Sequence, residues 1–218
     1  MTNDIIFTKL TGKLIETWGH MNTIAVRENR KDIIFKIAIQ CFNEYGYYKT
    51  SMDLIAKKAQ ITKPGLYYHF KSKDELFLDA FRYINKKFMD QLTSHVSKVT
   101  DPEKRLLTFC KLLNPYLPEN TEFIKYCQEM VALSIRKPEI RQVMTAYYRE
   151  QVKRVQKAID EGIDSGKFID VDSEKTARAF VLITMAVYNV YFNFEPDFEL
   201  IDQHTFNLNY MVGRLKKD

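Results

Sequence analysis

Apolar residues recur at three- and four-residue spacing along almost the whole chain, and this spacing is the period of an α-helix. The first such stripe consists of Ile33, Ile34, Ile37, Ala38, Cys41, Phe42 and Tyr45. No segment shows the alternation typical of a half-buried strand. Because 45% of the 218 residues are hydrophobic and only 7 are Gly and 6 Pro, disorder is excluded. The pattern predicts an all-α globular protein.

Capping residues divide the positions after the first stripe into two short helices and the start of a long one. Gly46 ends the first helix as a left-handed cap, and Ser51 is a suitable N-cap for a helix of about two turns. Thr62 caps the next short helix. Ser72 followed by Glu75 is a capping box that opens the long helix. The predicted order is therefore a long helix, two short helices and a second long helix.

The basic charge is concentrated in one part of the chain. Residues 21–95 hold 13 Lys and Arg against 8 Asp and Glu, whereas residues 96–218 hold 18 of each. This excess equals the net charge of the whole chain, which is +5. It fits a polyanion partner, because Lys and Arg that neutralise phosphates release counterions. Charge alone fits a solvated basic face equally well.

The segment 51–70 has the parts of a helix-turn-helix: two short helices, a tight turn, an apolar inner face and polar side chains outside. The predicted inner face consists of Met52, Ile55, Ala56, Ile61, Leu66 and Phe70. The side chains left for phosphates and base edges are Lys57, Lys58, Lys63, Tyr67, Tyr68 and His69. A helix that lies in the major groove of DNA needs an apolar face for packing and a polar face for contacts with the DNA.

The run TSMDLIAKKAQITKPGLYYHFKSKDELF, residues 50–77, resembles the DNA-binding signature of the TetR/AcrR family of transcriptional regulators. One departure is Gln60, because the family usually has glycine in the turn. The resemblance implies an N-terminal three-helix helix-turn-helix domain and a C-terminal helical domain for effector binding and dimerisation. The implied boundaries are an unassigned extension over 1–27, the DNA-binding domain over 28–88 and the helical domain over 89–218.

The resemblance also implies a set of DNA contacts. These are Thr50, Ser51, Thr62, Lys63, Pro64, Gly65, Tyr67, Tyr68, His69 and Lys73. Thr50 and Ser51 match positions that anchor the second helix to phosphate, and Lys73 matches a phosphate contact at the start of the fourth helix. Tyr67 could instead pack against the first helix. Asp53 is expected to stabilise its helix dipole rather than to read a base.

Two apolar stripes near the C-terminus suit a four-helix bundle made by two subunits. They consist of Ala179, Leu182, Ile183, Ala186, Val187 and Val190 on the penultimate helix and Phe206, Leu208, Met211, Val212 and Leu215 on the last. An ordinary intramolecular core is the alternative. A homodimer is favoured because a palindromic operator needs two recognition helices about 34 to 36 Å apart.

The middle of the chain is rich in aromatic residues and Met, which suit a pocket for a hydrophobic or amphipathic effector or, equally, a plain core. These residues are Phe81, Phe88, Met89, Leu92, Phe109, Leu113, Tyr116, Phe123, Tyr126, Cys127, Met130, Leu133, Met144, Tyr147 and Tyr148. The sequence singles out no effector-binding residue among them.

The hypothesis that follows is a dimeric repressor released from a palindromic DNA operator by a small effector. The alternatives are a ligand-independent DNA-binding regulator and a redox-responsive one that uses Cys41, Cys110 or Cys127. We expect no enzyme, no metal and no cofactor, because the four His are scattered and no HExxH or GxSxG motif occurs.

The longest uncharged stretch, residues 179–194, has 16 residues, fewer than the roughly 20 that span a bilayer. The first residues lack the pattern of a secretory signal. Three unpaired cysteines also fit a reducing compartment. We therefore expect a cytoplasmic protein without a membrane partner.

Overall fold

The computed structural model of the protein describes residues 30–112 and 121–217. Across these residues the regular elements are α-helices, as predicted. They are α2 (Arg30–Lys49), α3 (Met52–Lys58), α4 (Lys63–His69), α5 (Lys73–Val96), α6 (Pro102–Leu112), α7 (Thr121–Ser134), α8 (Pro138–Asp164), α9 (Ser173–Asn193) and α10 (Leu200–Gly213). The predicted extension over 1–27, Leu113 and Tyr116 lie outside the described residues.

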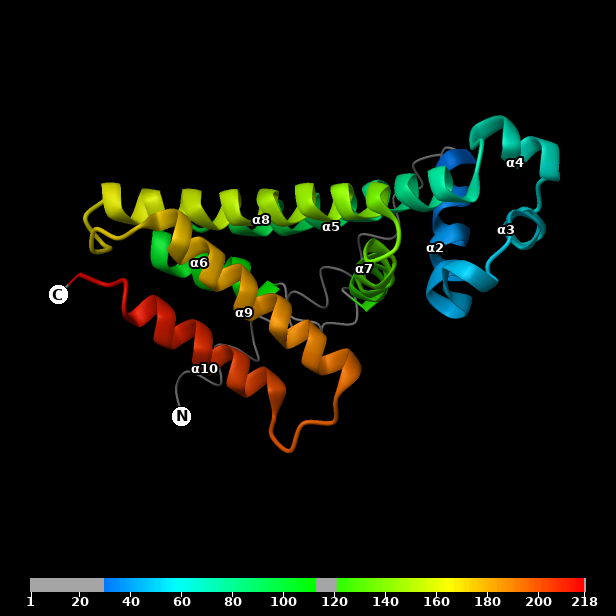
Figure 1. Cartoon of the computed structure of the whole chain (residues 1–218). Helices are drawn as coiled ribbons and strands as arrows, with labels where there is room; N and C mark the ends of the chain where they lie inside the picture. Colours follow the sequence, from blue (N-terminus) through cyan, green and yellow to red (C-terminus); the bar gives the residue numbers. More distant parts are fainter. Residues whose placement is uncertain (1–29, 113–120, 218) are drawn as a thin grey trace.

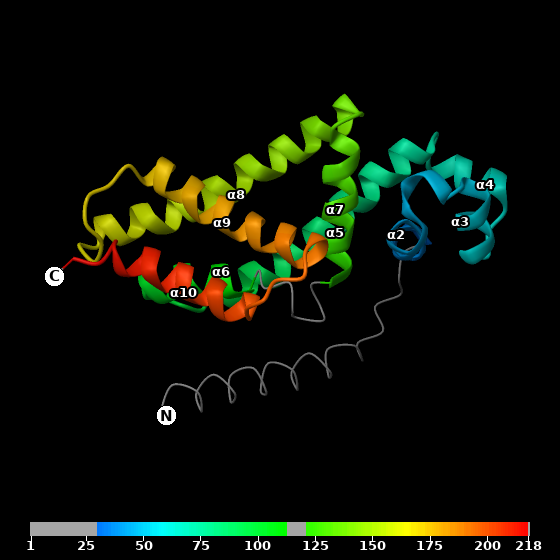
Figure 2. The same cartoon turned by 60° about the horizontal axis from the view of Figure 1, so that its bottom comes forward.

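The helices form a small N-terminal part and a larger helical bundle (Figure 1). Helices α2, α3 and α4 lie together at one end of the molecule, and α5 leads from them into the bundle of α6–α10. A second view shows the same separation, with α9 and α10 on the side of the bundle remote from α3 and α4 (Figure 2). Helix α5 runs without a break through residue 88, where the sequence places a domain boundary.

The predicted caps form as local hydrogen bonds. The Ser51 hydroxyl accepts from the Leu54 N–H at 3.1 Å, and the Ser72 hydroxyl accepts from the Glu75 N–H at 3.1 Å. In a capping box, the Glu75 side chain would accept from the Ser72 N–H. Here the Glu75 carboxylate accepts instead from the Lys71 N–H at 2.7 Å. Each cap satisfies N–H groups that have no partner inside the helix.

Gly46 interrupts α2 with φ 75° and ψ 167°. A positive φ was predicted, but the ψ value lies far from that of a left-handed helical cap. This backbone conformation is accessible to glycine and strained for other residues. The turn that it makes directs Tyr47 into the core, where the side chain is 5% exposed.

The core is continuous from the N-terminal part into the bundle. The Tyr126 ring on α7 stacks on the Phe77 ring on α5 at 4.9 Å between centroids, and the Tyr126 hydroxyl donates to the Phe77 carbonyl at 2.9 Å. Within the first stripe, Ile33 and Tyr45 are the most exposed members, at 42% and 37%. They lie at the edge of the face that α2 buries.

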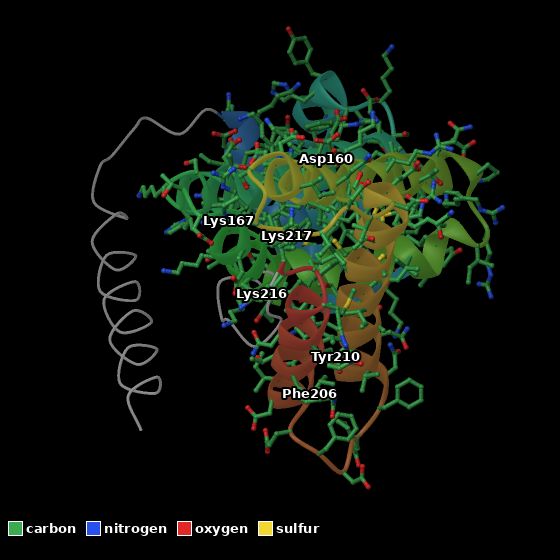
Figure 3. All side chains as sticks on the ribbon, turned by 90° about the vertical axis from the view of Figure 1, so that its left-hand side faces the viewer. Asp160, Lys167, Phe206, Tyr210, Lys216 and Lys217 are labelled. Carbon is green, nitrogen blue, oxygen red and sulfur yellow. The ribbon has the colours of Figure 1, made fainter. Side chains whose placement is uncertain are left out.

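The C-terminal residues pair with the connection between α8 and α9. Lys216 forms an isolated antiparallel bridge with Phe168, and the Lys217 N–H donates to the Lys167 carbonyl at 3.0 Å. Figure 3 shows these lysines at the same end of the molecule. Among the described helices, none is long and apolar enough to cross a membrane.

Candidate nucleic-acid interface

The turn between α3 and α4 closes through two backbone hydrogen bonds. The Ile61 N–H donates to the Ala56 carbonyl at 3.0 Å, and the Gln60 N–H donates to the Lys57 carbonyl at 3.2 Å. This pair of bonds is a Schellman motif, which needs a left-handed residue after the helix. Gln60 takes that conformation with φ 53°. The departure from glycine is therefore accommodated by backbone strain, and the turn keeps its geometry.

The inner faces of α3 and α4 are packed as predicted. Five of the six predicted residues are buried, and Ile61 is half-buried at the turn. The buried ones are Met52, Ile55, Ala56, Leu66 and Phe70. Since these side chains hold α4 against α2 and α3, the opposite face of α4 is turned to solvent.

The outer face of α4 carries polar and aromatic side chains. The Thr62 hydroxyl caps the helix by accepting from the Gly65 N–H at 3.1 Å. Tyr68 is 86% exposed and Tyr67 is 43% exposed, so Tyr67 is a surface residue rather than part of the core. Together with exposed Lys63 they make a face that can hydrogen bond to phosphates and base edges.

Lys63 forms an ion pair that the sequence reasoning missed. Its ammonium lies 2.8 Å from the nearer carboxylate oxygen of Asp53, on the first turn of α3. The hydrogen bond to Asp53 and its charge raise the pKa of Lys63 above the ordinary value. The two residues are ten positions apart, and only the helix-turn-helix geometry brings them together. Asp53 therefore orients the cation at the start of α4.

Lys73 points inward to the end of α2. Its ammonium donates to the Tyr47 carbonyl at 2.8 Å and to the Thr50 carbonyl at 3.0 Å, and it lies 4.2 Å from the centre of the Tyr47 ring. Burial lowers the pKa of Lys73 below its ordinary value. An ammonium has three N–H groups, so one remains for a phosphate.

Thr50 is a correction to the predicted contacts. Its side chain is 1% exposed, and the hydroxyl lies 2.8 Å from the Gly46 carbonyl and 3.0 Å from the Cys41 carbonyl. The hydroxyl therefore ties the end of α2 together and cannot reach DNA. Ser51, the next residue, is exposed.

A polar cluster that no sequence pattern predicts joins the N-terminal part to the bundle. The Tyr47 hydroxyl donates to the Asp74 carboxylate on α5. Lys137, at the start of α8, donates to that carboxylate at 2.7 Å and to the Tyr47 hydroxyl at 3.2 Å. The Tyr47 N–H donates to the Glu129 carboxylate on α7 at 2.6 Å. We call these four residues the Tyr47 cluster.

The Tyr47 cluster places charges close together in a half-buried site. Burial raises the pKa of Asp74, but hydrogen bonds from Lys137 and Tyr47 and the charges of Lys137 and Lys73 outweigh that effect. The pKa of Asp74 therefore lies below its ordinary value. The pKa of Lys137 lies above its ordinary value, chiefly because of the hydrogen bond to Asp74.

An exposed polar face on a short helix, held by a scaffold helix within a basic segment, defines a helix-turn-helix DNA-binding regulator. Residues 34–80 match the family model of bacterial regulatory proteins of the tetR family. The helix-turn-helix part of the chain therefore belongs to this family, and helices α6–α10 follow it as a C-terminal helical domain.

Named relatives agree with this assignment, and a solved structure shares the fold. An HTH-type transcriptional regulator of Bacillus subtilis, YhgD, is 28% identical over 81% of this chain and 90% of its own length. IcaR of Staphylococcus aureus, a negative transcriptional regulator of a biofilm operon, is 43% identical over 27% of this chain and 34% of its own. A regulator from Saccharomonospora viridis, crystallised with choline, superposes with a TM-score of 0.77 at 19% identity over 86% and 98% of the two chains.

Proposed function

We propose that the protein is a homodimeric repressor that binds a palindromic operator through α4 and the ends of α3 and α5. The observation that carries the proposal is the solvent-facing polar surface of α4. The proposed DNA contacts are Ser51, Thr62, Lys63, Pro64, Gly65, Tyr67, Tyr68, His69 and the remaining N–H of Lys73. Repression is supported by the similarity of the N-terminal part to IcaR, a negative regulator.

The dimer interface that we propose is the outer face of α9 and α10. Leu182 and Met185 on α9 are 56% and 37% exposed, and Phe206 and Tyr210 on α10 are 62% and 57% exposed. The two α10 rings stack on each other with centroids 6.2 Å apart (Figure 3). Large apolar side chains gathered on a surface are typical of an interaction site.

The two predicted stripes divide between this outer face and the subunit's own core. Val187, Leu208, Val212 and Leu215 are buried within the chain. These four residues follow the intramolecular alternative rather than the dimer. Their packing fixes α10 on α9, and this leaves Leu182 and Phe206 outside for a second subunit.

We also propose that a small molecule bound in the bundle controls DNA binding. One groove of about 340 Å³ lies between α7, α8 and α9 and is lined by Phe123, Met144 and Tyr147 from the predicted interior, and by Leu182 and Met185 at the edge of the proposed dimer face. That volume lies within the usual range for ligand sites. The S. viridis regulator, whose fold is similar, was crystallised with choline. In this chain, the Tyr47 cluster connects α7 and α8 to the DNA-binding part, so an effector that moves these helices would move α4.

A redox-responsive alternative finds no support in the two cysteines whose side chains the structure describes. Burial raises the pKa of Cys41, and burial also raises the pKa of Cys127. A thiol with a raised pKa carries little thiolate, which is the species that reacts with oxidants.

The test is selection of bound sequences from a random DNA duplex pool with the purified full-length protein at near-physiological salt. We expect an enriched palindrome. Lys63→Ala should then weaken operator binding by about tenfold or more and affect random DNA far less, because a base contact is specific. Equal losses on operator and random DNA would show that Lys63 does not read a base. Failure to enrich any sequence would contradict the repressor proposal.

A further inference from the structure

A second cavity lies in the part of the bundle remote from the helix-turn-helix. It has a volume of about 350 Å³ and is formed by the last turn of α5, by α6 and by the second half of α8. Figure 1 shows these helix segments at the end opposite α3 and α4. Its apolar walls are Val96, Leu106, Phe109, Val155 and Ala158. An apolar tail of a small molecule would be buried between them.

The charged residues around this cavity are mostly basic. They are Arg105, Arg154, Lys157 and Glu161. Arg105 neutralises Glu161 through a direct ion pair between α6 and α8. Its other guanidinium nitrogens donate to the Val99 carbonyl at 2.8 Å and to the Thr100 carbonyl at 3.3 Å. Arg105 and Glu161 therefore act as a structural pair, and Arg154 and Lys157 are the basic residues around the cavity that do not pair with Glu161.

Arg154 presents an unsatisfied donor. One terminal nitrogen pairs with Glu150 at 3.1 Å, one turn earlier on α8. Its Nε atom is buried and has no hydrogen-bond partner in the described part of the chain. A buried donor without an acceptor is unfavourable, and more so when the group is charged. An acceptor supplied by a ligand would remove this penalty.

Lys157 lies three positions after Arg154, so the two side chains lie on neighbouring positions of the same helix face. Among the described residues, no carboxylate forms an ion pair with Lys157. A carboxylate has two oxygens and can accept from both cations at once. The cavity thus combines an apolar interior with two cations on one wall.

We propose that this cavity binds an organic anion, namely a carboxylate on a linear alkyl chain. The carboxylate accepts from the Nε–H of Arg154 and from the ammonium of Lys157, and the alkyl chain lies against Phe109 and Ala158. The inference deepens the proposed function, because it rests on the bundle being the effector-binding part and names the chemical class of the effector.

The position of the site on α8 offers a route to the DNA-binding part. Helix α8 has 27 residues, and it begins one residue after Lys137 of the Tyr47 cluster. The same helix carries Arg154 and Lys157 in its second half. Helix α5 likewise starts beside α4 and ends at the cavity. A ligand that draws these two helices together at the cavity would also shift their opposite ends. Those ends hold Asp74 and Lys137 of the Tyr47 cluster.

The experiment is titration calorimetry of the full-length protein with octanoate, with neutral octanamide and with cationic octylamine. We expect octanoate to bind at least tenfold more tightly than the other two. Arg154→Gln should weaken octanoate binding by about tenfold to a hundredfold, in the range expected for a hydrogen bond to a charged group. Arg149→Gln, at an exposed site on the same helix, is the matched control and should bind as the natural chain does.

A second variant tests the apolar wall with the charges intact. Ala158→Leu fills the cavity and should abolish octanoate binding while its helical circular dichroism and melting temperature stay near those of the natural chain. Equal affinity for octanamide and octanoate, unchanged binding by Arg154→Gln or no binding of octanoate would each overturn the proposal.

Operator binding, measured separately by fluorescence anisotropy with and without octanoate, distinguishes this proposal from the proposed function. Arg154-dependent octanoate binding without any effect on operator affinity supports the site and contradicts its role as an effector site. Operator binding without octanoate binding would support the proposed function and overturn the inference of an octanoate site.

Discussion

The Tyr47 hydroxyl gives the sharpest test of how the two parts of the molecule are joined. Tyr47→Phe removes the hydrogen bond to Asp74 and the acceptor for Lys137, but it keeps the aromatic ring. The ammonium groups of Lys73 and Lys137 lie 4.2 and 4.8 Å from the centre of that ring, and a phenyl ring retains these contacts. The substitution therefore isolates one hydroxyl.

The expected magnitude follows from the geometry. A hydrogen bond to a charged group contributes roughly 1.5 to 3 kcal/mol to folding. The Asp74 side chain is 53% exposed and keeps its ion pair with Lys137, so water and Lys137 compensate part of the loss. We expect Tyr47→Phe to lower the free energy of unfolding by about 1 kcal/mol. For a chain of this size that corresponds to a fall in melting temperature of roughly 2 to 4 °C.

The assay is thermal and urea unfolding of the natural chain, Tyr47→Phe and Tyr48→Phe. Tyr48 is the matched control, because it is the next residue and is 64% exposed. Its substitution should change stability by less than about 0.5 kcal/mol. Equal effects of the two substitutions, or no loss for Tyr47→Phe, would refute the reasoning that the buried hydroxyl joins α2, α5 and α8.

Three other predictions concern the turn, the acid range and the dimer. Gln60→Gly should raise the free energy of unfolding by about 0.5 to 1 kcal/mol, because relief of left-handed strain exceeds the entropy of glycine, and urea unfolding measures it. Asp74 has a lowered pKa in the folded state, so its stabilisation is present above the unfolded pKa near 3.9 and is lost as the pH falls through the lower folded value. The melting temperatures of the natural chain and Asp74→Asn should therefore differ at pH 7 and converge as the pH falls below about 3.9, and a constant difference would contradict the assignment. Phe206→Glu combined with Tyr210→Glu should raise the dimer dissociation constant by at least tenfold in light scattering, and an unchanged dimer would place the interface elsewhere.

Much of the helix-turn-helix could be predicted because its determinants are local in the sequence. Ser51 and Ser72 bond to N–H groups three positions ahead, and a residue pattern records such bonds directly. The same holds for the inner face of α3 and α4, where spacing alone identifies the buried side. Gln60 was recognised as a departure, and the structure supplied its consequence, a left-handed residue in an otherwise ordinary turn.

The apolar stripe predicted on the last helix shows that spacing alone does not tell which apolar residues are buried within the chain. Leu208 and Phe206 are both apolar members of one predicted stripe, yet Leu208 is fully buried and Phe206 is 62% exposed. Spacing identifies which residues are apolar, but α9 and α6 occupy one side of α10 and leave the other side open. Which side is covered depends on the packing of whole helices.

The amino-acid pattern alone is enough to predict the all-α fold, the position of the helix-turn-helix and most of its outward side chains. How particular polar groups are used depends on the tertiary structure. The Thr50 hydroxyl bonds to the backbone at the end of α2, and Lys137 donates to the hydroxyl of Tyr47, which lies 90 positions earlier in the chain. The cavity beside Arg154 is likewise assembled from three separate helices. Hydrogen bonds and ion pairs act over about 3 Å, so partners distant in the chain become visible only when folding brings their helices together.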